Sequence, residues 1–442
     1  MNHKKTELIF SIYDTLFNNK KGNAMAWQDF HTVLEQLQFD DSVAGGALVI
    51  YKDGKQTVNT AIGNATSDLA WSGRTLSVNF SIGKGVMATL VAILVSKGIL
   101  DYDKPIGHYW KAFANNGKHN ITLRHVLTHT SGLFNITTLT QSIDDLTDWQ
   151  IMGDLVANMT TDTPKGQEIH GYASAYSALV SGWIIGHVIE RVTDESLQMV
   201  LDCHLAKPLG LMGQMFYELP SEKCHQVARP VRYFNGMPNN KRKPTLKPDT
   251  PEILKTLANL PTTALWKNAL KDTDITTANI NRLYFDTSKM NLTNYKNALM
   301  PNGRDGVEYY SQAVMTAKIP AANGVSTAQA LACMYAMHAN GGVWQEQVLI
   351  NPNVMNDLRR IQVDGFDAVM PANMRWRTGF HRLFSLQNTP NAYGHMGYNG
   401  SVAFCDPDRH LSFAFIHNFD TTMLNDVRQF ALSEMVLSGA FE

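Results

Sequence analysis

The chain has 442 residues, of which 44% are hydrophobic and 17% charged, and its formal net charge is -1. This length predicts two lobes or one large domain, and the composition argues against long disordered segments. The near-zero net charge gives no reason to expect nucleic acid or an anionic membrane as a partner.

The cysteines and the N-terminus bear on the compartment. The four cysteines lie far apart without a C-x-x-C pair, which is typical of reduced thiols in a cytosolic protein. The N-terminal stretch LIFSIYDTLF is broken by Asp14 and is not followed by a clear cleavage site, so we expect no signal peptide. The sequence therefore predicts a cytoplasmic protein, while leaving export open.

The first elements expected along the chain are a helix and a β-hairpin. Apolar residues at helical spacing predict a helix over residues 27–37. The stretch GALVIYKDGKQTVNTAIG, residues 46–63, predicts two strands around a tight turn at Asp53-Gly54, because glycine accepts a positive φ. We assign residues 1–40 to an N-terminal helical extension.

The middle of the chain, from about residue 80 to 330, predicts mainly helices and loops. Helices are expected over 179–192 and 328–339, and the second ends at Asn340-Gly341-Gly342. Residues 234–308 are polar and rich in Asn, Thr, Lys and Pro. We interpret this segment as a cap or insertion with short helices rather than as a separate domain.

The end of the chain predicts strands again. The stretch GSVAFCDPDRHLSFAFIHN gives two strands around a turn at 406–408, and a final helix is expected over 424–437. Strands at both ends with helices between them predict an α+β fold. Residues 41–78 and 343–442 would form a lobe with an antiparallel sheet flanked by helices, and residues 79–342 an inserted, mainly helical lobe.

Ser81 and Lys84 are the first candidates for chemistry. Lys84 is the one charged residue between Thr75 and Ser96, and its i, i+3 spacing from Ser81 brings both side chains to the same face of a helix. A lysine in apolar surroundings has a lowered pKa and can exchange protons with a serine nucleophile. The alternative is an N-cap serine followed by a lysine that reaches the surface. The apolar run after Lys84 is about a dozen residues, too short to span a bilayer.

Three further segments resemble one family. No G-x-S-x-G nucleophile elbow is present. FSIGKG with LDYDKP, the stretch YWKAFANNGKHNITLRHVLTHTSGL, and AKIPAANGVSTAQALACMYAMHANGG are similar to the serine β-lactamase/penicillin-binding-protein superfamily. They resemble its class C β-lactamase-like branch and, most of all, the family VIII carboxylesterases. The resemblance covers most of residues 45–435, with 234–308 matched poorly, and it implies a β-lactamase/transpeptidase-like fold.

The family's second motif is Tyr-x-Asn or a variant, and two tyrosines compete for that position. In GYASAYSALVSGWIIGHVIERVT, Tyr176-Ser177-Ala178 fits the register better than Tyr172-Ala173-Ser174. The resemblance implies that a Tyr176 phenolate, stabilised by nearby cations, takes the proton of Ser81 and later protonates the leaving group. A tyrosine that only anchors the start of a helix is the alternative.

The family's third motif is Lys-Thr-Gly or His-x-Gly, and GHMGYNGS offers His395-Met396-Gly397. The resemblance implies that His395 donates a hydrogen bond to substrate or to Tyr176. It also implies that the backbone passes close to substrate at Gly397, and that the N–H of Tyr398 forms an oxyanion hole with that of Ser81.

Two departures from the family pattern bear on the substrate. Ala178 stands where the motif has asparagine, and His395-Met396 stands where it has Lys-Thr. In β-lactamases that asparagine and lysine help to hold the substrate's amide and carboxylate. Their loss favours ester substrates over lactams.

His125 and His129 have the i, i+4 spacing of a metal-binding pair, but no H-E-x-x-H glutamate lies between them. We expect structural roles for both, and neither a metal nor another cofactor.

Together these features predict a serine hydrolase that works through an acyl-enzyme, most simply a carboxylesterase on short-chain esters. A β-lactamase, or a D-amino-acid peptidase or amidase, is the alternative on the same scaffold. A non-catalytic binding protein of the same fold is a more distant one. The expected partner is a small-molecule ester or amide, with no nucleic acid and no membrane, and the sequence sets no oligomeric state.

Overall fold

The computed structural model describes residues 27, 29–39, 43–140, 142–234, 249–301 and 306–439. The helix expected over 27–37 is present as α2 (Asp29–Gln36). Residues 1–26 of the expected N-terminal extension lie outside the described residues.

The α-helices of the first half are short except for two. After α2 they are α3 (Ile82–Ser96), α4 (Ile106–Tyr109), α5 (Leu123–Leu127), α6 (Ile143–Thr147), α7 (Trp149–Asn158), α8 (Gln167–His170), α9 (Val180–Thr193) and α10 (Leu197–Leu201). Those of the second half are α11 (Pro251–Leu257), α12 (Thr263–Leu270), α13 (Thr277–Tyr284), α14 (Leu292–Leu299), α15 (Gln312–Thr316), α16 (Ala328–Ala339), α17 (Pro352–Arg359) and α18 (Arg428–Leu437).

The main sheet has six strands in the order β2-β1-β12-β11-β10-β9, and every neighbouring pair is antiparallel. The strands are β1 (Gly46–Lys52), β2 (Lys55–Ile62), β9 (His381–Arg382), β10 (Tyr393–Met396), β11 (Val402–Asp406) and β12 (Leu411–His417). The hairpin expected over 46–63 is confirmed, with Asp53 and Gly54 at φ 51° and 73° in its turn. The antiparallel sheet built from both ends of the chain is likewise confirmed.

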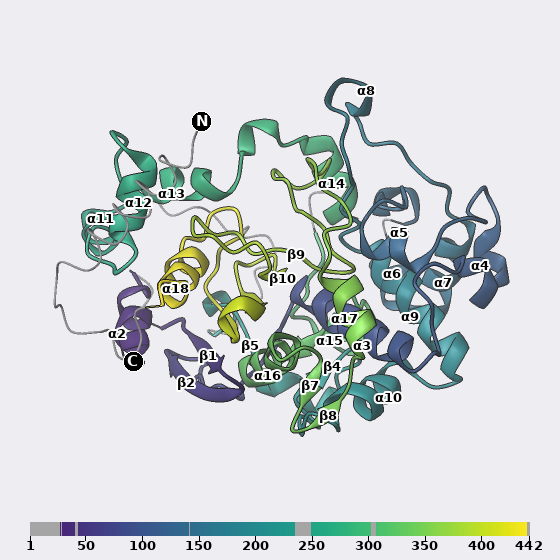
Figure 1. Ribbon diagram of the computed structural model, residues 1–442, viewed down its shortest axis with the longest axis horizontal. Helices are drawn as coiled ribbons and strands as arrows, with labels where there is room; N and C mark the ends of the chain where they lie inside the picture. Colours follow the sequence, from purple (N-terminus) through teal and green to yellow (C-terminus); the bar gives the residue numbers. More distant parts are fainter. Residues whose placement is uncertain are drawn as a thin grey trace, which may run out of the picture.

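Helices cover both faces of this sheet, because successive strand residues point to opposite sides. On β1, Ala47 and Val49 pack in the core that contains α16, whereas Leu48 and Ile50 pack in the core that contains α18. α16 contacts β1, β11 and β12, although it falls within the range expected for the helical lobe. Figure 1 shows α18 on the side of the molecule away from α5, α7 and α9.

The expected helices are largely present. Those predicted over 179–192 and 328–339 correspond to α9 and α16. The final helix begins at Arg428 rather than at 424. The Asp426 carboxylate accepts the N–H of Arg428 at 2.8 Å, so it satisfies an N–H of the first turn that has no acceptor within the helix.

A smaller sheet, which the sequence did not predict, leads into α3. Its strands are too short to show a periodic pattern: β3 (Leu76–Val78), β4 (Met215–Phe216), β5 (Val227–Ala228) and β6 (Val325–Ser326). A two-residue pair, β7 (Val343–Trp344) and β8 (Gln347–Val348), follows α16. The small sheet matters for function because β3 fixes where Ser81 begins its helix.

The polar segment expected as an insertion forms the short helices α11–α14 in its described part, 249–301. The ring of Tyr284 in α13 stacks on Phe430 of α18 at 3.7 Å, and its hydroxyl donates to the buried Glu434 at 3.0 Å. At its other end, Asn294 of α14 donates to the carbonyl of Ala368 at 3.2 Å. The insertion therefore packs against the sheet lobe and reaches the loop that follows α17.

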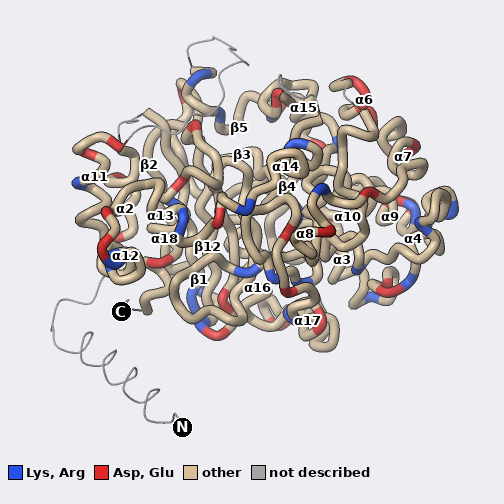
Figure 2. Tube along the Cα trace, turned by 90° about the horizontal axis from the view of Figure 1, so that it is seen from above, with Lys and Arg blue, Asp and Glu red and all other residues tan. Residues whose placement is uncertain are grey.

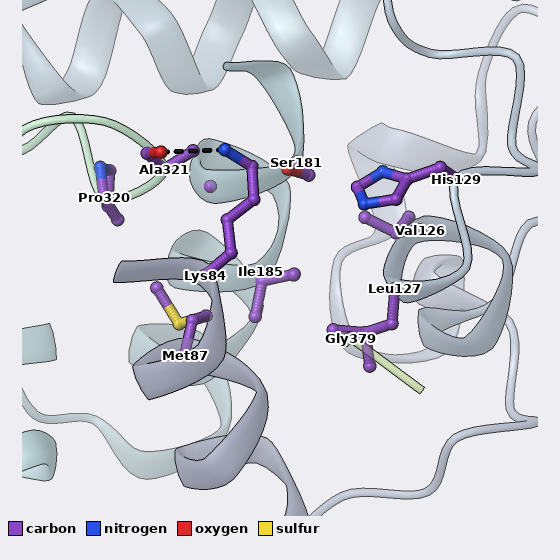
Figure 3. A pocket seen from close by; sticks show the side chains of 11 residues that line it. Lys84, Met87, Val126, Leu127, His129, Ser181, Ile185, Pro320, Ala321 and Gly379 are labelled. Atoms are coloured by element: carbon purple, nitrogen blue, oxygen red, sulfur yellow. Dashed lines mark hydrogen bonds between the residues drawn. The ribbon is translucent and has the colours of Figure 1, made fainter. Parts of the chain in front are cut away.

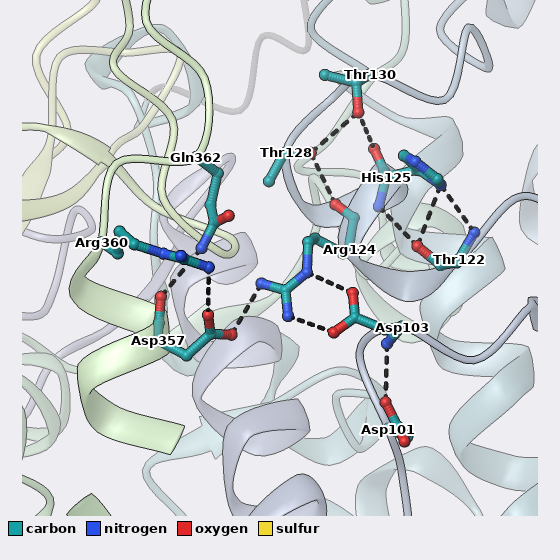
Figure 4. Close-up of polar contacts among 10 residues, drawn as sticks. All are labelled: Asp101, Asp103, Thr122, Arg124, His125, Thr128, Thr130, Asp357, Arg360 and Gln362. Carbon is teal, nitrogen blue, oxygen red and sulfur yellow. Dashed lines mark hydrogen bonds and ion pairs between the residues drawn. The ribbon is translucent and has the colours of Figure 1, made fainter. Parts of the chain in front are cut away.

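Charged residues are dispersed over the described part of the chain, with acidic and basic positions mixed along most elements (Figure 2). One ion-pair group joins α5 to α17 (Figure 4). Arg124 donates to both oxygens of Asp103 at 2.6 and 2.7 Å and to Asp357 at 2.8 Å. Arg360 also donates to Asp357, at 3.0 Å. The side chains of Arg124 and Asp357 are only 20% and 24% exposed, so solvent screens this pair less than an ordinary surface pair.

We predict that Arg124→Met lowers the free energy of unfolding by about 1–2 kcal/mol, between the values for exposed and buried ion pairs. Arg360→Met is the matched control, since its side chain is 66% exposed, and we expect a change below about 0.5 kcal/mol. Urea unfolding of the three proteins measures both values. Equal losses in the two variants would contradict the assignment of Arg124 as the joint between α5 and α17.

Candidate active site

Ser81 lies between β3 and α3, where it is the N-cap residue of the helix. Its side chain makes no capping hydrogen bond, so the simpler interpretation of Ser81 as a capping residue is not supported. The preceding Phe80 has φ 48°, a conformation that bulky residues adopt only when their surroundings enforce it. The rings of Tyr309 and Tyr398 pack against Phe80 at 5.4 and 6.0 Å.

Lys84 points into the protein and is only 8% exposed, so it does not reach the surface as the alternative required. Its Nζ lies 2.6 Å from the carbonyl oxygen of Ala178, 2.8 Å from that of Ala321 and 3.1 Å from Ser81 Oγ. These three contacts include no carboxylate, and burial lowers the pKa of Lys84 well below its usual value. Carbonyl oxygens only accept hydrogen bonds, so a neutral amine uses its two N–H groups on them and keeps its lone pair for Ser81.

Tyr176 reaches Ser81 from the loop before α9. Its hydroxyl donates to Ser81 Oγ at 2.7 Å, while its ring stacks on Trp376 at 5.6 Å and meets His129 edge-on at 4.9 Å. Burial raises the pKa of Tyr176 above its usual value, more than the hydrogen bond to Ser81 lowers it. The raised pKa favours the phenol over the expected phenolate, because burial disfavours the charged form and the adjacent lysine is itself pushed toward neutrality.

A cavity of about 20 Å³ lies beside Lys84. Its lining includes Lys84, His129, Ser181 and Ala321 (Figure 3). This volume is enough for one water molecule. The Lys84 side chain thus lines a small cavity rather than facing bulk solvent.

His395 lies in β10 and is 2% exposed. Its ring is 4.8 Å from that of His381 and 6.4 Å from that of Tyr176. Burial lowers the pKa of His395, which keeps the imidazole neutral. Its Nε2 has no hydrogen-bond partner among the described residues, so the expected hydrogen bond to Tyr176 is not present.

Gly397 and Tyr398 follow His395 and pass close to the turn before Ser81. A Cβ at Gly397 would lie 3.0 Å from the carbonyl oxygen of Asn79, a tight contact with backbone, so this close approach favours glycine. The N–H groups of Ser81 and Tyr398 have no partner within the described part of the chain. Both are thus available to a ligand, as an oxyanion hole requires.

The sequence did not predict a hydrogen-bonded group of Asp367, Ser174 and Trp376 that packs against Tyr176. Asp367 and Ser174 share a 2.6 Å hydrogen bond although they lie 193 positions apart, and Trp376 donates to both. An isolated aspartate or tryptophan in a loop carries no spacing signal. Only the three-dimensional pairing of the two loops identifies this group.

His125 and His129 do not form a pair. The Nδ1 atom of His125 accepts the N–H of Thr122 at 3.1 Å, and that of His129 accepts the N–H of Ser177 at 3.2 Å. Each ring therefore has a structural role. The described residues contain no group of three His, Cys, Asp or Glu side chains suited to a metal ion.

No helix within the described ranges is long and apolar enough to cross a membrane. The four cysteines are free, and all except Cys203 are buried.

Comparison with known proteins identifies the family of the chain. The family model described as Beta-lactamase matches residues 30–432. The esterase/beta-lactamase LipL of Mycobacterium tuberculosis is 29% identical over 379 residues, which cover 85% of this chain and 77% of LipL. A penicillin-binding protein homologue from Caulobacter crescentus is 26% identical with a TM-score of 0.70, covering 93% of this chain and 97% of that one. A family VIII carboxylesterase is 25% identical with a TM-score of 0.66, covering 91% and 95%.

The chain therefore belongs to the Beta-lactamase family, and it is a serine hydrolase with the β-lactamase/transpeptidase-like fold. The resemblance predicted from its motifs is confirmed.

The two competing tyrosines differ in their surroundings. Tyr172 lies against His170, with ring centroids 5.3 Å apart, whereas the hydroxyl of Tyr176 contacts Ser81. We predict that Tyr176→Phe lowers kcat/KM for an ester by at least about 100-fold, the usual contribution of a positioned proton donor. Tyr172→Phe, the matched control, should stay within about 3-fold of wild type. Steady-state kinetics of both variants measure these effects. A larger loss in Tyr172→Phe than in Tyr176→Phe would contradict the assignment of Tyr176 as the tyrosine of the active site.

Proposed function

We propose that the protein hydrolyses carboxylic esters through an acyl-enzyme on Ser81. One observation carries this proposal: Ser81 Oγ lies 2.7 Å from the hydroxyl of Tyr176 and 3.1 Å from Nζ of Lys84. A serine between a neutral amine and a phenol has both a proton acceptor and a proton donor within hydrogen-bond distance.

Acylation begins when the Ser81 hydroxyl loses its proton to the lone pair of Lys84. Oγ then forms a bond to the carbonyl carbon, and the displaced electron pair moves to the carbonyl oxygen, where the N–H groups of Ser81 and Tyr398 bind the negative charge. Collapse of this intermediate breaks the bond to the alcohol. The phenol of Tyr176 protonates the leaving oxygen and regains its proton from the Lys84 ammonium.

Deacylation repeats these steps with water as the nucleophile. Lys84, neutral again, takes a proton from water as the hydroxyl attacks the acyl carbon, and the same N–H groups bind the oxyanion. Breaking the bond to Oγ releases the acid, and the proton returns to Ser81. Every proton that leaves one group is accepted by another, so the cycle needs no cofactor.

The preference for esters rests on Ala178 and His395. Ala178 contributes only its carbonyl oxygen, which binds Lys84, and its methyl group offers no hydrogen bond to a substrate amide. Burial keeps His395 neutral, so it offers no positive charge to the carboxylate that β-lactam antibiotics carry. The family VIII enzyme is named as a carboxylesterase, which supports the same choice, whereas the name of LipL includes both esterase and beta-lactamase. A β-lactamase or D-amino-acid amidase remains the second candidate.

Turnover of matched chromogenic substrates tests this preference. We predict that kcat/KM for p-nitrophenyl acetate or butyrate exceeds that for a chromogenic cephalosporin by at least about 100-fold. The reason is that the site offers no hydrogen-bond or charge partner to the amide and carboxylate of the cephalosporin. Ser81→Ala should abolish turnover of both. The opposite substrate ranking would favour the β-lactamase alternative, and ester turnover that survives in Ser81→Ala would contradict catalysis at this site.

The state of Lys84 predicts the pH dependence. Lys84 acts as its neutral amine, and burial lowers its pKa, so kcat/KM should rise with pH through that lowered pKa and reach a plateau well below the ordinary lysine value of about 10.4. Activity is lost as the pH falls through the same pKa, because the amine becomes protonated. A pH–rate profile with p-nitrophenyl butyrate measures this limb. An increase that begins only near pH 10 would contradict a neutral resting amine.

The expected location and partner also belong to the proposal. Free thiols at all four cysteines suit a reducing compartment, which supports the cytoplasm. The partner we propose is a small, uncharged ester, since the basic side chain that contacts Ser81 among the described residues is Lys84, which acts as a neutral amine.

A further inference from the structure

Asp367 is a buried carboxylate that the reaction steps above do not use. It lies in the loop between α17 and β9 and is 2% exposed. Its Oδ1 accepts the N–H groups of Val369 and Met370 at 2.8 Å each, which shape its own loop, and that of Tyr176 at 3.3 Å. One oxygen atom thus joins this loop to the backbone of the tyrosine that contacts Ser81.

The second oxygen of Asp367 supports the same tyrosine from another direction. Oδ2 accepts the hydroxyl of Ser174 at 2.6 Å and the indole N–H of Trp376 at 3.3 Å. The Trp376 ring stacks on that of Tyr176, with an angle of 15° between their planes. Asp367 therefore fixes both the backbone of Tyr176 and the surface on which its ring rests.

Backbone hydrogen bonds also join the loop of Asp367 to the segment before Tyr176. Ala173 donates to the carbonyl of Phe366 at 2.9 Å, and Ala368 donates to that of Ser174 at 2.8 Å. Asn294 of α14 binds the carbonyl of Ala368, so the insertion also supports this loop. The segment that contains Tyr176 is thus held along its length rather than at one point.

The chemistry of the site requires a carboxylate at residue 367. Its two oxygens together meet five donors, and only an acceptor-only group satisfies all of them. Asparagine would direct an NH₂ group at one side of this set and oppose a donor with a donor. The buried donor that then has no acceptor destabilises the protein by the full free energy of its desolvation.

Asp367 also acts on the charge of Tyr176. The other titratable groups that face this phenol are Lys84, His129, His395 and Tyr295. Burial keeps the two imidazoles neutral and disfavours the charged forms of the lysine and the second tyrosine. Burial is the main cause that raises the pKa of Tyr176, and the carboxylate of Asp367 adds to it in the same direction.

We propose that Asp367 is a positioning residue for Tyr176: it orients the phenol toward Ser81 Oγ. This inference rests on the proposed function, because it concerns the step in which Tyr176 protonates the leaving group. A misplacement of about 1 Å at such a group costs roughly 100-fold in rate.

A double-mutant cycle with Tyr176→Phe tests the inference. Asp367→Asn should lower kcat for p-nitrophenyl butyrate by about 10- to 100-fold with KM within about 3-fold of wild type, since the phenol acts in the reaction rather than in binding. In the Tyr176→Phe background the same substitution should cost less than about 2-fold, because no phenol is left to position. Equal losses in both backgrounds would overturn the inference and assign Asp367 a general structural role.

Ser174→Ala tests the same inference if Asp367→Asn folds poorly. It leaves the Asp367 carboxylate in place with its other hydrogen-bond donors. It removes one donor to Asp367, and we expect a loss in kcat of about 3- to 10-fold that also disappears in the Tyr176→Phe background. Ser412→Ala is the matched control, because this buried serine donates to the carbonyl of Ala332, at 2.7 Å, away from Ser81 and Tyr176, and should leave kcat unchanged. A Ser174→Ala loss that persists in the Tyr176→Phe background would overturn the inference.

The same experiment separates this inference from the proposed function. Wild-type protein without ester turnover would remove the proposed function and with it the role of Asp367. Active wild type with additive losses in the cycle would remove only the role of Asp367.

Discussion

A lysine amine enclosed by carbonyl oxygens is the interaction on which the rest of the site depends. Lys84 is buried between the carbonyls of Ala178 and Ala321 and faces Ser81. Burying an ammonium without a carboxylate is expensive, so the environment favours the amine, and the amine has one lone pair to offer. The cost of burying this group and its usefulness as a base therefore have the same physical origin.

The fold assembles this environment from segments that are distant in the sequence. β3 and the strained Phe80 set the position of Ser81, and α3 carries Lys84 one turn later. The loop before α9 supplies both the Ala178 carbonyl and Tyr176, while the segment before β6 supplies Ala321. The end of β10 brings Gly397 and Tyr398 to the same place. β3 of the small sheet and the end of β10 in the main sheet thus come together beside Ser81.

Local patterns in the sequence predicted much of this arrangement. The hairpin at residues 46–63, α9 and α16 follow from alternation, turn residues and helical spacing, and the motif resemblance directed attention to Ser81, Lys84 and Tyr176. Two features were beyond such reasoning. The raised pKa of Tyr176 depends on its burial, which a motif does not encode. Asp367 contacts Ser174 and Tyr176, which lie far from it in the sequence and become its neighbours only in the folded protein. No periodicity or spacing in the sequence predicts these contacts.

The central claim is that Ser81 is a nucleophile activated by its contacts, and covalent labelling tests it most directly. Wild-type protein is treated with a fluorophosphonate, and the adduct is located by intact mass measurement and peptide mapping. We predict one adduct per chain, located on Ser81, with no labelling of Ser81→Ala and much slower labelling of Lys84→Met. Wild-type protein that stays unlabelled, or a Ser81→Ala variant that is labelled equally well, would contradict the account.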